Sequence, residues 1–383
     1  MRGFLLPSVV SVVSILTAVN ANPIEKRQCA ATLNTALSVA TTLQSHYFNT
    51  GNGQYTGGSL WTDANTLEDL HNLMLATGTD QFGAVADQSF IGKSAQDSST
   101  AHWQSILGGS NDDAGWIVMA LWKIADYKIA RGLNATPYLN SALTIYDIIA
   151  AQWDSVCGGG VWWSTAHTYK NAITNELFLL TSATGAINFP TQRPFLANAQ
   201  KTWAWLQSSG MRNSNNLWND GLTQDGTCKN NGQTTWTYNQ GVIASGLAAL
   251  YAVTKDTSLL TQAELTLDAT IRLLSTNNIL KESCDNAAAG EPCATKTRSQ
   301  IFKGIWTKSL QFYLDRANDP ARNAKYSGFL GSQSSAVFHF GTDAANDVGS
   351  VWYAPNAGGS VFTPKTSASG LEAHIAAAKY GPC

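Results

Sequence analysis

Apolar residues recur along most of the chain at the spacing of amphipathic helices, and Gly-, Asn-, Ser- and Thr-rich stretches separate these segments. Several segments carry helix start and stop signals, since Pro137 and Pro320 fall in first turns and Gly132 and Gly210 follow last turns. The pattern predicts about a dozen helices. They span residues 30–47, 63–77, 79–95, 111–130, 136–153, 171–184, 191–208, 235–254, 257–275, 298–317, 320–337 and 366–379.

These helices indicate a single all-α domain over residues 28–383. Taken in pairs they make helical hairpins, and no Pro/Ser-rich linker or change in composition divides them. A closed toroid of hairpins is the arrangement we expect. The segments Trp116–Ile129 and Gly241–Val253 are apolar on most sides and are therefore predicted to lie in its inner ring.

The first residues have the layout of an export signal. A basic start, the apolar run Phe4–Leu16 and small residues up to Ala21 predict a signal peptide over residues 1–21. The Lys26-Arg27 pair is typical of a dibasic processing site and predicts a short pro-segment over residues 22–27, although such pairs are also common on surfaces. We expect a secreted, extracellular protein. The tail Leu371–Cys383 lacks the hydrophobic stretch of a lipid-anchor signal, so no membrane anchor is expected.

The cysteine content fits an oxidising compartment. Six cysteines predict up to three disulfides rather than a metal site. Cys284 and Cys293 bracket a short loop and are expected to pair, whereas Cys29 and Cys383 are each expected to attach one chain end to the body. The remaining connectivity stays open. The sequence Asn134-Ala135-Thr136 predicts a glycosylation site.

Composition narrows the possible ligands. Hydrophobic residues make up 44% and charged residues 13% of the 383, which excludes a charge-rich disordered chain. With 24 Lys and Arg against 26 Asp and Glu, the chain lacks the basic field that nucleic acid or an anionic membrane requires. The loops 50–60, 154–169 and 211–235 combine tryptophan with Gly, Asn and Asp, which favours a carbohydrate cleft; a tryptophan-rich core is the alternative. The tryptophans expected at the mouth of this cleft are Trp61, Trp162, Trp163, Trp218 and Trp236.

Two neighbouring acids, Asp112 and Asp113, stand at the start of the helix predicted over residues 111–130. Acids in a first turn often only cap the helix and offset its dipole. In a shared cleft, however, two adjacent carboxyls repel, so that one holds a proton while the other stays ionised. Glycosidic cleavage needs such an acid and base, and adjacent attachment favours the short carboxyl separation of a retaining mechanism.

Six short motifs follow one another in order through the mature chain. They are Asn111-Asp112-Asp113, Gly159-Gly160-Val161-Trp162-Trp163, Asn175-Glu176-Leu177-Phe178, Asn219-Asp220-Gly221, Thr237-Tyr238-Asn239-Gln240-Gly241 and Phe302-Lys303-Gly304-Ile305. Together, from about residue 30 to 375, they resemble glycoside hydrolase family 76, the α-1,6-mannanases of bacteria and fungi. The resemblance implies an (α/α)6 barrel and retaining hydrolysis of α-1,6-mannan without a cofactor. It also implies that Asp112 is the nucleophile and Asp113 the general acid/base.

The same motifs supply candidate substrate-binding residues. Asp220 lies in a Gly-bounded loop and is expected to bind mannose hydroxyls, unless it only forms a turn. Trp162 and Trp163 are the expected stacking platform, with at least one of them packing inward. The remaining candidates are expected to act as ligands or as helix caps and core residues: Asn111, Asn175, Tyr238, Asn239 and Gln240. The six histidines lack ligand spacing, so no metal site is predicted.

The function hypothesis is therefore a secreted, retaining endo-α-1,6-mannanase of fungal cell-wall polysaccharide, acting as a monomer. Two alternatives stay open. A transglycosidase would use the same covalent intermediate with a sugar acceptor on glycoprotein anchors, and a non-catalytic mannan-binding protein would use the aromatic cleft without the acid pair.

Overall fold

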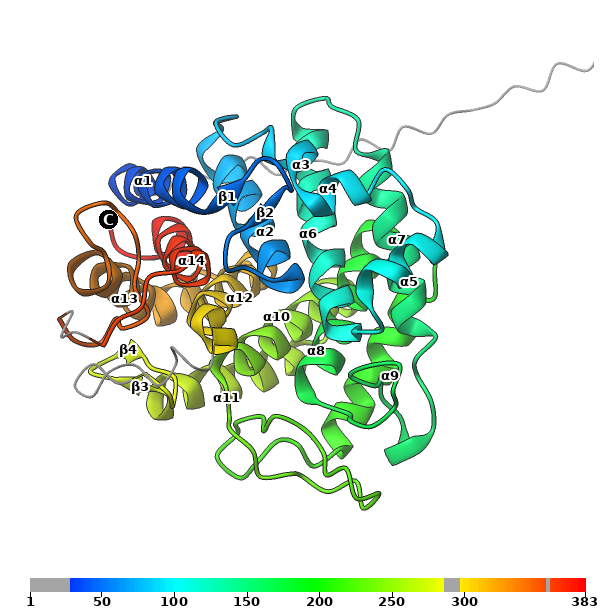
Figure 1. Cartoon of the computed structure of the whole chain (residues 1–383). Helices are drawn as coiled ribbons and strands as arrows, with labels where there is room; N and C mark the ends of the chain where they lie inside the picture. Colours follow the sequence, from blue (N-terminus) through cyan, green and yellow to red (C-terminus); the bar gives the residue numbers. More distant parts are fainter. Residues whose placement is uncertain (1–27, 286–296, 356–358) are drawn as a thin grey trace, which may run out of the picture.

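The computed structural model describes residues 28–285, 297–355 and 359–383. Six long helices form a closed inner ring in which each helix packs against the next one along the chain and the last packs against the first. Figure 1 shows this ring surrounded by the other helices. The inner helices are α2 (Leu60–Thr77), α6 (Asn111–Ala130), α8 (Ala172–Asn188), α10 (Thr237–Thr254), α12 (Phe302–Ala317) and α14 (Pro364–Tyr380).

An outer layer covers the ring, since each long outer helix packs on a neighbouring inner helix. The long outer helices are α1 (Ala30–Tyr47), α7 (Thr136–Ala150), α9 (Phe195–Ser208), α11 (Thr257–Leu273) and α13 (Pro320–Ala336). Short helices occupy the sixth outer position: α3 (Val85–Gln88), α4 (Phe90–Ser94) and α5 (Thr100–Leu107). This arrangement is the (α/α)6 barrel that the sequence predicts, and α6 and α10 lie in its inner ring as expected.

The prediction of one long helix over residues 79–95 is wrong, because the chain forms the short helices α3 and α4 there. The backbone of Ser89 is extended (φ −64°, ψ 153°), and its hydroxyl accepts the Gly92 N–H as the cap of α4. Ser99 caps α5 in the same way by accepting the His102 N–H. Serine is favoured at the N-cap position over a helix interior, so the chain breaks into short helices at these residues. One of them, α5, is not predicted by the periodicity.

Short elements complete the described fold. They are the hairpin strands β1 (Phe48–Asn49) and β2 (Gln54–Tyr55), the hairpin strands β3 (Ser275–Thr276) and β4 (Ile279–Leu280), the 3₁₀ turns η1 (Val156–Gly158) and η3 (Thr297–Ile301), and the π-helical turn η4 (Val337–Gly341).

Close approach of the inner helices explains the glycine in the Phe302-Lys303-Gly304 motif. A Cβ at Gly304 would lie 2.4 Å from the Cα of Ser369, and the Gly304 N–H donates to the Ser369 hydroxyl at 2.8 Å. Helices α12 and α14 can therefore pack this closely only with glycine at this position.

A buried ion cluster joins three inner helices. Lys308 of α12 contacts Glu68 at 2.8 Å and Asp69 at 2.7 Å, both on α2, and its side chain is only 3% exposed. Burial and the neighbouring charge of Asp69 raise the pKa of Glu372 on α14 well above its usual value. A protonated, uncharged Glu372 adds no further negative charge beside the cluster.

The disulfides differ in part from expectation. Cys29 and Cys383 pair with each other, so the two ends of the domain are joined rather than attached separately to the body. Figure 1 places the C-terminus beside α1 and α14. A second disulfide joins Cys157 to Cys228. Cys284 is disulfide-bonded, while its expected partner Cys293 lies outside the described residues, as do the predicted signal peptide and pro-segment.

None of the helices in the described ranges combines the length and apolar character needed to cross a membrane.

Candidate active site

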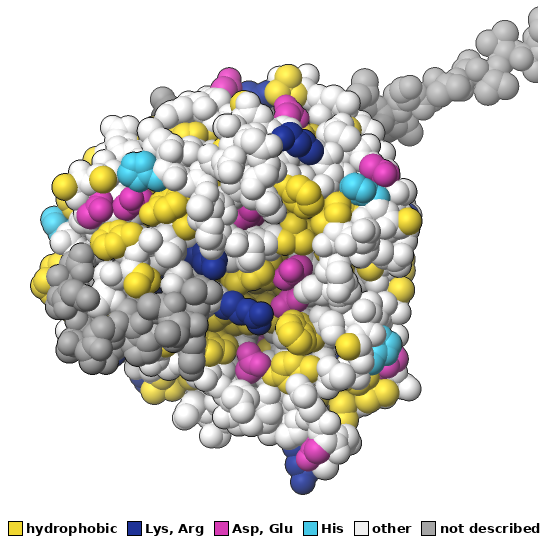
Figure 2. All heavy atoms as spheres, viewed as in Figure 1, with side chains coloured by type: hydrophobic (Ala, Val, Ile, Leu, Met, Phe, Trp, Pro, Cys, Tyr) yellow, Lys and Arg dark blue, Asp and Glu magenta, His cyan; other side chains and the backbone are white. Residues whose placement is uncertain are grey.

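A cleft with a cavity volume of about 940 Å³ opens at one end of the barrel. Figure 2 shows a hollow with a hydrophobic floor, flanked by acidic and basic side chains. Every inner helix contributes a residue from its N-terminal end: Trp61 of α2, Asp112 and Asp113 of α6, Asn171 before α8, Tyr238 of α10, Phe302 of α12 and Lys365 of α14. Helix N-termini carry partial positive charge, so this end of the barrel favours negatively charged groups.

Aromatic rings from four inner helices form the floor. Phe302 stacks on Tyr238 with ring centroids 3.9 Å apart and planes 6° apart. Phe302 also lies 5.5 Å from Trp236 and 6.2 Å from Trp61, which in turn lies 6.1 Å from Trp116. A continuous aromatic surface of this kind matches the apolar faces of sugar rings.

Asp112 receives three hydrogen bonds. The Ser110 hydroxyl donates to Oδ1 at 2.7 Å, the Trp163 indole N–H donates to Oδ2 at 2.9 Å, and the Asp113 backbone N–H donates to Oδ1 at 3.0 Å. Burial raises the pKa of Asp112, and these donors oppose the rise because they stabilise the charged carboxylate.

Asp113 has a different environment. Burial and the neighbouring charge of Asp112 raise the pKa of Asp113 to about 7, against the opposing effects of the Ser110 hydroxyl and the Arg298 guanidinium. Two neighbouring carboxyls in one cleft favour a state in which they share one proton. Because more donors stabilise the charge on Asp112, the hydrogen bonds favour that proton on Asp113.

The loop over residues 154–169 is paired with the start of α6 and so fixes Trp163 beside the acids. The Asn111 N–H donates to the Trp163 carbonyl at 2.9 Å, and Ser110 and Ser164 form an antiparallel bridge. Trp163 is thereby held where its indole reaches Asp112.

A third acid, Asp220, also lines the cleft. The Tyr169 hydroxyl donates to its Oδ2 at 2.5 Å, and the Asn231 amide donates to the Tyr169 hydroxyl at 2.9 Å. Burial raises the pKa of Asp220, whereas the bond from Tyr169 lowers it. Asp220 is positioned to accept hydrogen bonds from a ligand in the cleft.

Several predicted site residues do not line this cleft. The Asn111 amide donates to the Trp162 carbonyl at 2.8 Å, Asn175 exchanges hydrogen bonds with the Val161 backbone, and Gln240 does so with the Trp218 backbone. All three are buried amides that tie loops to the inner ring.

Two predicted tryptophans are also directed elsewhere. Trp162 donates its indole N–H to Asp154 at 2.7 Å and lines a second, smaller cavity, while Trp218 is buried against Trp203. Asn239 is fully buried and does not line the cleft, and neither end of its amide has a hydrogen-bond partner among the described residues.

The cleft contains side chains that no motif indicates, because each stands at an isolated loop or first-turn position. The polar ones are Ser59, Tyr169, Asn171, Gln224, Arg298, Ser299 and Lys365. Two sequence features could have indicated cleft residues: Arg298 precedes the motif that starts at Phe302, and Lys365 follows Pro364 at a helix start. Among the described residues, no group of three or more His, Cys, Asp or Glu side chains is arranged to hold a metal ion.

Comparisons with known proteins agree with this geometry. The profile of glycosyl hydrolase family 76 matches residues 32–379. A putative mannan endo-1,6-alpha-mannosidase of Schizosaccharomyces pombe is 23% identical over 74% of this chain and 65% of its own length. A mannan endo-1,6-alpha-mannosidase of Candida albicans is 27% identical over 54% of this chain and 47% of its own. The matches thus span between about half and two thirds of these relatives.

Solved structures share the fold. An inactive variant of an α-1,6-mannanase from Salegentibacter, in complex with α-1,6-mannotriose, superposes with a TM-score of 0.76 at 19% identity, over 91% of this chain and 99% of that one. Dfg5 from Chaetomium thermophilum, in complex with glucosamine, superposes with a TM-score of 0.75 at 17% identity, over 93% of this chain and 92% of that one. The family match extends over most of the chain and includes the acid pair, and the chain therefore belongs to glycosyl hydrolase family 76.

Proposed function

We propose that this protein is a secreted endo-α-1,6-mannanase that hydrolyses the mannan backbone with retention of anomeric configuration. The observation that carries the proposal is the acid pair, in which three hydrogen-bond donors favour the charged form of Asp112 and the pKa of Asp113 is raised to about 7. One carboxylate and one protonated acid beside an aromatic floor are the groups that glycosidic cleavage needs.

In the first step Asp112 attacks the anomeric carbon, and Asp113 donates its proton to the leaving glycosidic oxygen. A covalent mannosyl ester forms on Asp112 as the glycosidic bond breaks. Asp113, now ionised, removes a proton from water, which attacks the anomeric carbon and releases Asp112. The two inversions give net retention.

The substrate assignment draws on relatives. The Salegentibacter α-1,6-mannanase was inactivated by replacing two consecutive aspartates, and its structure contains α-1,6-mannotriose. The curated relatives are mannan endo-1,6-alpha-mannosidases. An uncharged polymer also suits a cleft in which Arg298 and Lys365 offset the carboxylates of Asp112 and Asp220.

The test is release of oligosaccharides from linear α-1,6-mannan by the purified protein. We expect Asp113→Asn to lower kcat by about 10²–10⁴-fold, the usual contribution of a general acid, and Asp112→Asn to lower it at least as far. Asp147→Asn is the matched control, because Asp147 pairs with Arg193 on the surface. Full activity in either acid variant, or no release by the wild type, would contradict the proposal.

Adding a mannoside acceptor separates hydrolysis from transglycosylation. Hydrolysis predicts that products shorten at the same rate with or without the acceptor. Lengthened products would instead show that a sugar acceptor, rather than water, attacks the covalent intermediate. Unchanged mannan that stays tightly bound would support a binding protein.

A further inference from the structure

A hairpin tip, residues 223–229, forms part of the cleft wall. Gln224 of this tip lines both the main cleft and the second cavity, whose volume is about 350 Å³. Cys157 and Cys228 line the second cavity as well. The disulfide between them therefore lies next to the point where the two cavities meet.

Hydrogen bonds attach this tip to the barrel only through the residues that flank it: the Leu222 N–H donates to the Lys170 carbonyl at 3.0 Å, and the Asn230 amide donates to the Gly210 carbonyl at 2.9 Å. The Thr223 N–H donates to the Lys229 carbonyl at 2.7 Å, and Asp225 accepts from both the backbone N–H and the hydroxyl of Thr227. Within the described residues, every hydrogen bond of residues 223–229 has its partner inside the tip. Apart from the main chain, the covalent connection of the tip to the barrel is the Cys157–Cys228 disulfide, which links residues 71 positions apart.

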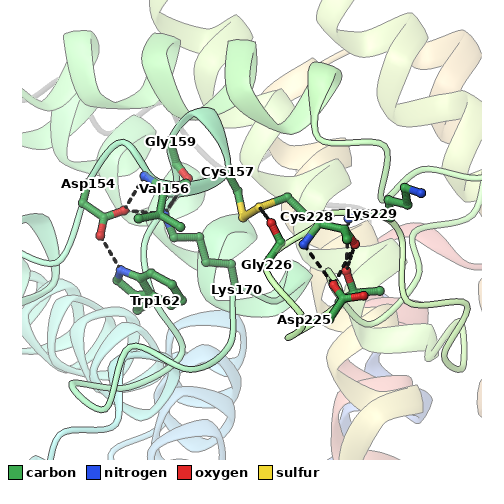
Figure 3. Close-up of a disulfide and its surroundings, with 12 residues drawn as sticks. Asp154, Val156, Cys157, Gly159, Trp162, Lys170, Asp225, Gly226, Cys228 and Lys229 are labelled. Atoms are coloured by element: carbon green, nitrogen blue, oxygen red, sulfur yellow. Dashed lines mark hydrogen bonds and ion pairs between the residues drawn. A yellow bond between two sulfur atoms is a disulfide. The ribbon is translucent and has the colours of Figure 1, made fainter.

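The other end of this disulfide is firmly held. Buried Lys170 donates to the carbonyls of Val156 and Gly159 at 2.6 and 2.7 Å and pairs with Asp154 at 2.6 Å. The Trp205 indole N–H donates to the Cys157 carbonyl at 2.9 Å. Figure 3 shows Lys170 and its partners on one side of the disulfide and the tip residues on the other. Cys157 is thus a fixed point, and the tip is the part that depends on it.

We infer that the Cys157–Cys228 disulfide is a clamp that sets substrate affinity by holding Gln224 in the cleft wall, where its amide hydrogen-bonds a hydroxyl of the bound saccharide. Gln224 is exposed and makes no hydrogen bond within the described residues, so its amide is available to a ligand. The identity of that saccharide as an α-1,6-mannan rests on the proposed function. Gln224 is then a specificity-determining residue and the disulfide positions it.

The first experiment measures the tip without substrate. Trypsin can cleave after Lys229, which is exposed in the tip. We expect Cys157→Ser/Cys228→Ser to be cleaved there faster than the wild type, at a temperature well below unfolding. The control is Cys29→Ser/Cys383→Ser, which removes the disulfide between the chain ends and leaves the tip held. Equal cleavage after Lys229 in the wild type and the Cys157→Ser/Cys228→Ser variant would overturn the clamp.

The second experiment measures KM on linear α-1,6-mannan. Gln224→Ala and Cys157→Ser/Cys228→Ser should each raise KM about twofold to tenfold, the loss expected for one neutral hydrogen bond, with kcat unchanged. The triple variant should show no further rise, because both changes remove the same contact. Additive effects, or an unchanged KM, would overturn the inference. If the wild type leaves the mannan intact, the proposed function fails, while the trypsin comparison still tests the clamp.

Discussion

Under the proposed mechanism, the start of α6 gives two identical side chains, Asp112 and Asp113, different roles. The pKa of Asp113 is raised to about 7, so the protonated acid is lost as the pH rises through that value. Asp112 must be ionised, so activity also falls as the pH drops through its own pKa. We therefore expect a bell-shaped profile of kcat/KM whose alkaline limb lies near pH 7.

Trp163→Phe tests the assignment of the acidic limb. The change removes one donor from the Asp112 carboxylate, which raises the pKa of Asp112 and should move the acidic limb to higher pH. Trp162→Phe is the matched control, since its indole bonds to Asp154 instead. An acidic limb that stays in place in Trp163→Phe would show that Asp112 is not the group that titrates there.

Sequence alone identifies the acid pair because adjacency is visible in a chain, but it does not say which neighbours face the cleft. Trp162 and Trp163 are adjacent and look equivalent in the sequence. Successive side chains of the loop point in opposite directions, however, so Trp163 contacts Asp112 and Trp162 lines the second cavity. Asn175 and Gln240 look like ligands because both are amides near motifs. Their hydrogen bonds to loop backbone appear only once the loops are placed.

At the scale of the elements, buried ion pairs between inner helices are expected to stabilise the fold. Lys308 neutralises Glu68 and Asp69 between α12 and α2, and its removal leaves buried carboxylates without a partner. Lys308→Met should lower the free energy of unfolding by about 3–5 kcal/mol, measured by urea denaturation. Lys325→Met on α13 removes pairs with Glu264 and Asp268 from a side chain that is 39% exposed, and should cost about 1 kcal/mol or less. Equal losses in the two variants would contradict the role given to burial.

Helical periodicity predicts most of these elements, because an inner or outer helix buries a continuous face. It fails over residues 79–95, where side-chain caps at Ser89 and then Ser99 decide where short helices begin. A short helix buries little apolar surface, so its apolar periodicity stabilises it only weakly. Side-chain caps therefore decide where the helices of this segment begin.

The whole molecule is a ring whose ends meet. Helix α1 packs on α14, α14 packs on α2, and Cys29–Cys383 joins residues 354 positions apart. Pairing the predicted helices into a closed toroid anticipates this architecture. The disulfide partners depend instead on where the ring closes, which spacing along the chain does not reveal. Because the cross-link restricts a long stretch of the unfolded chain, Cys29→Ser/Cys383→Ser should lower stability by about 2–5 kcal/mol in urea denaturation. An unchanged free energy of unfolding would contradict this role.

The barrel brings six helix N-termini, an aromatic floor and the acid pair into one cleft, and the central claim is that this cleft hydrolyses α-1,6-mannan with retention. Proton NMR of the anomeric signals during digestion of linear α-1,6-mannan tests activity, linkage and stereochemistry together. The account predicts that the new reducing ends appear first as the α-anomer and convert to the α/β mixture only by later mutarotation. First appearance of the β-anomer, or no new reducing ends, would contradict it.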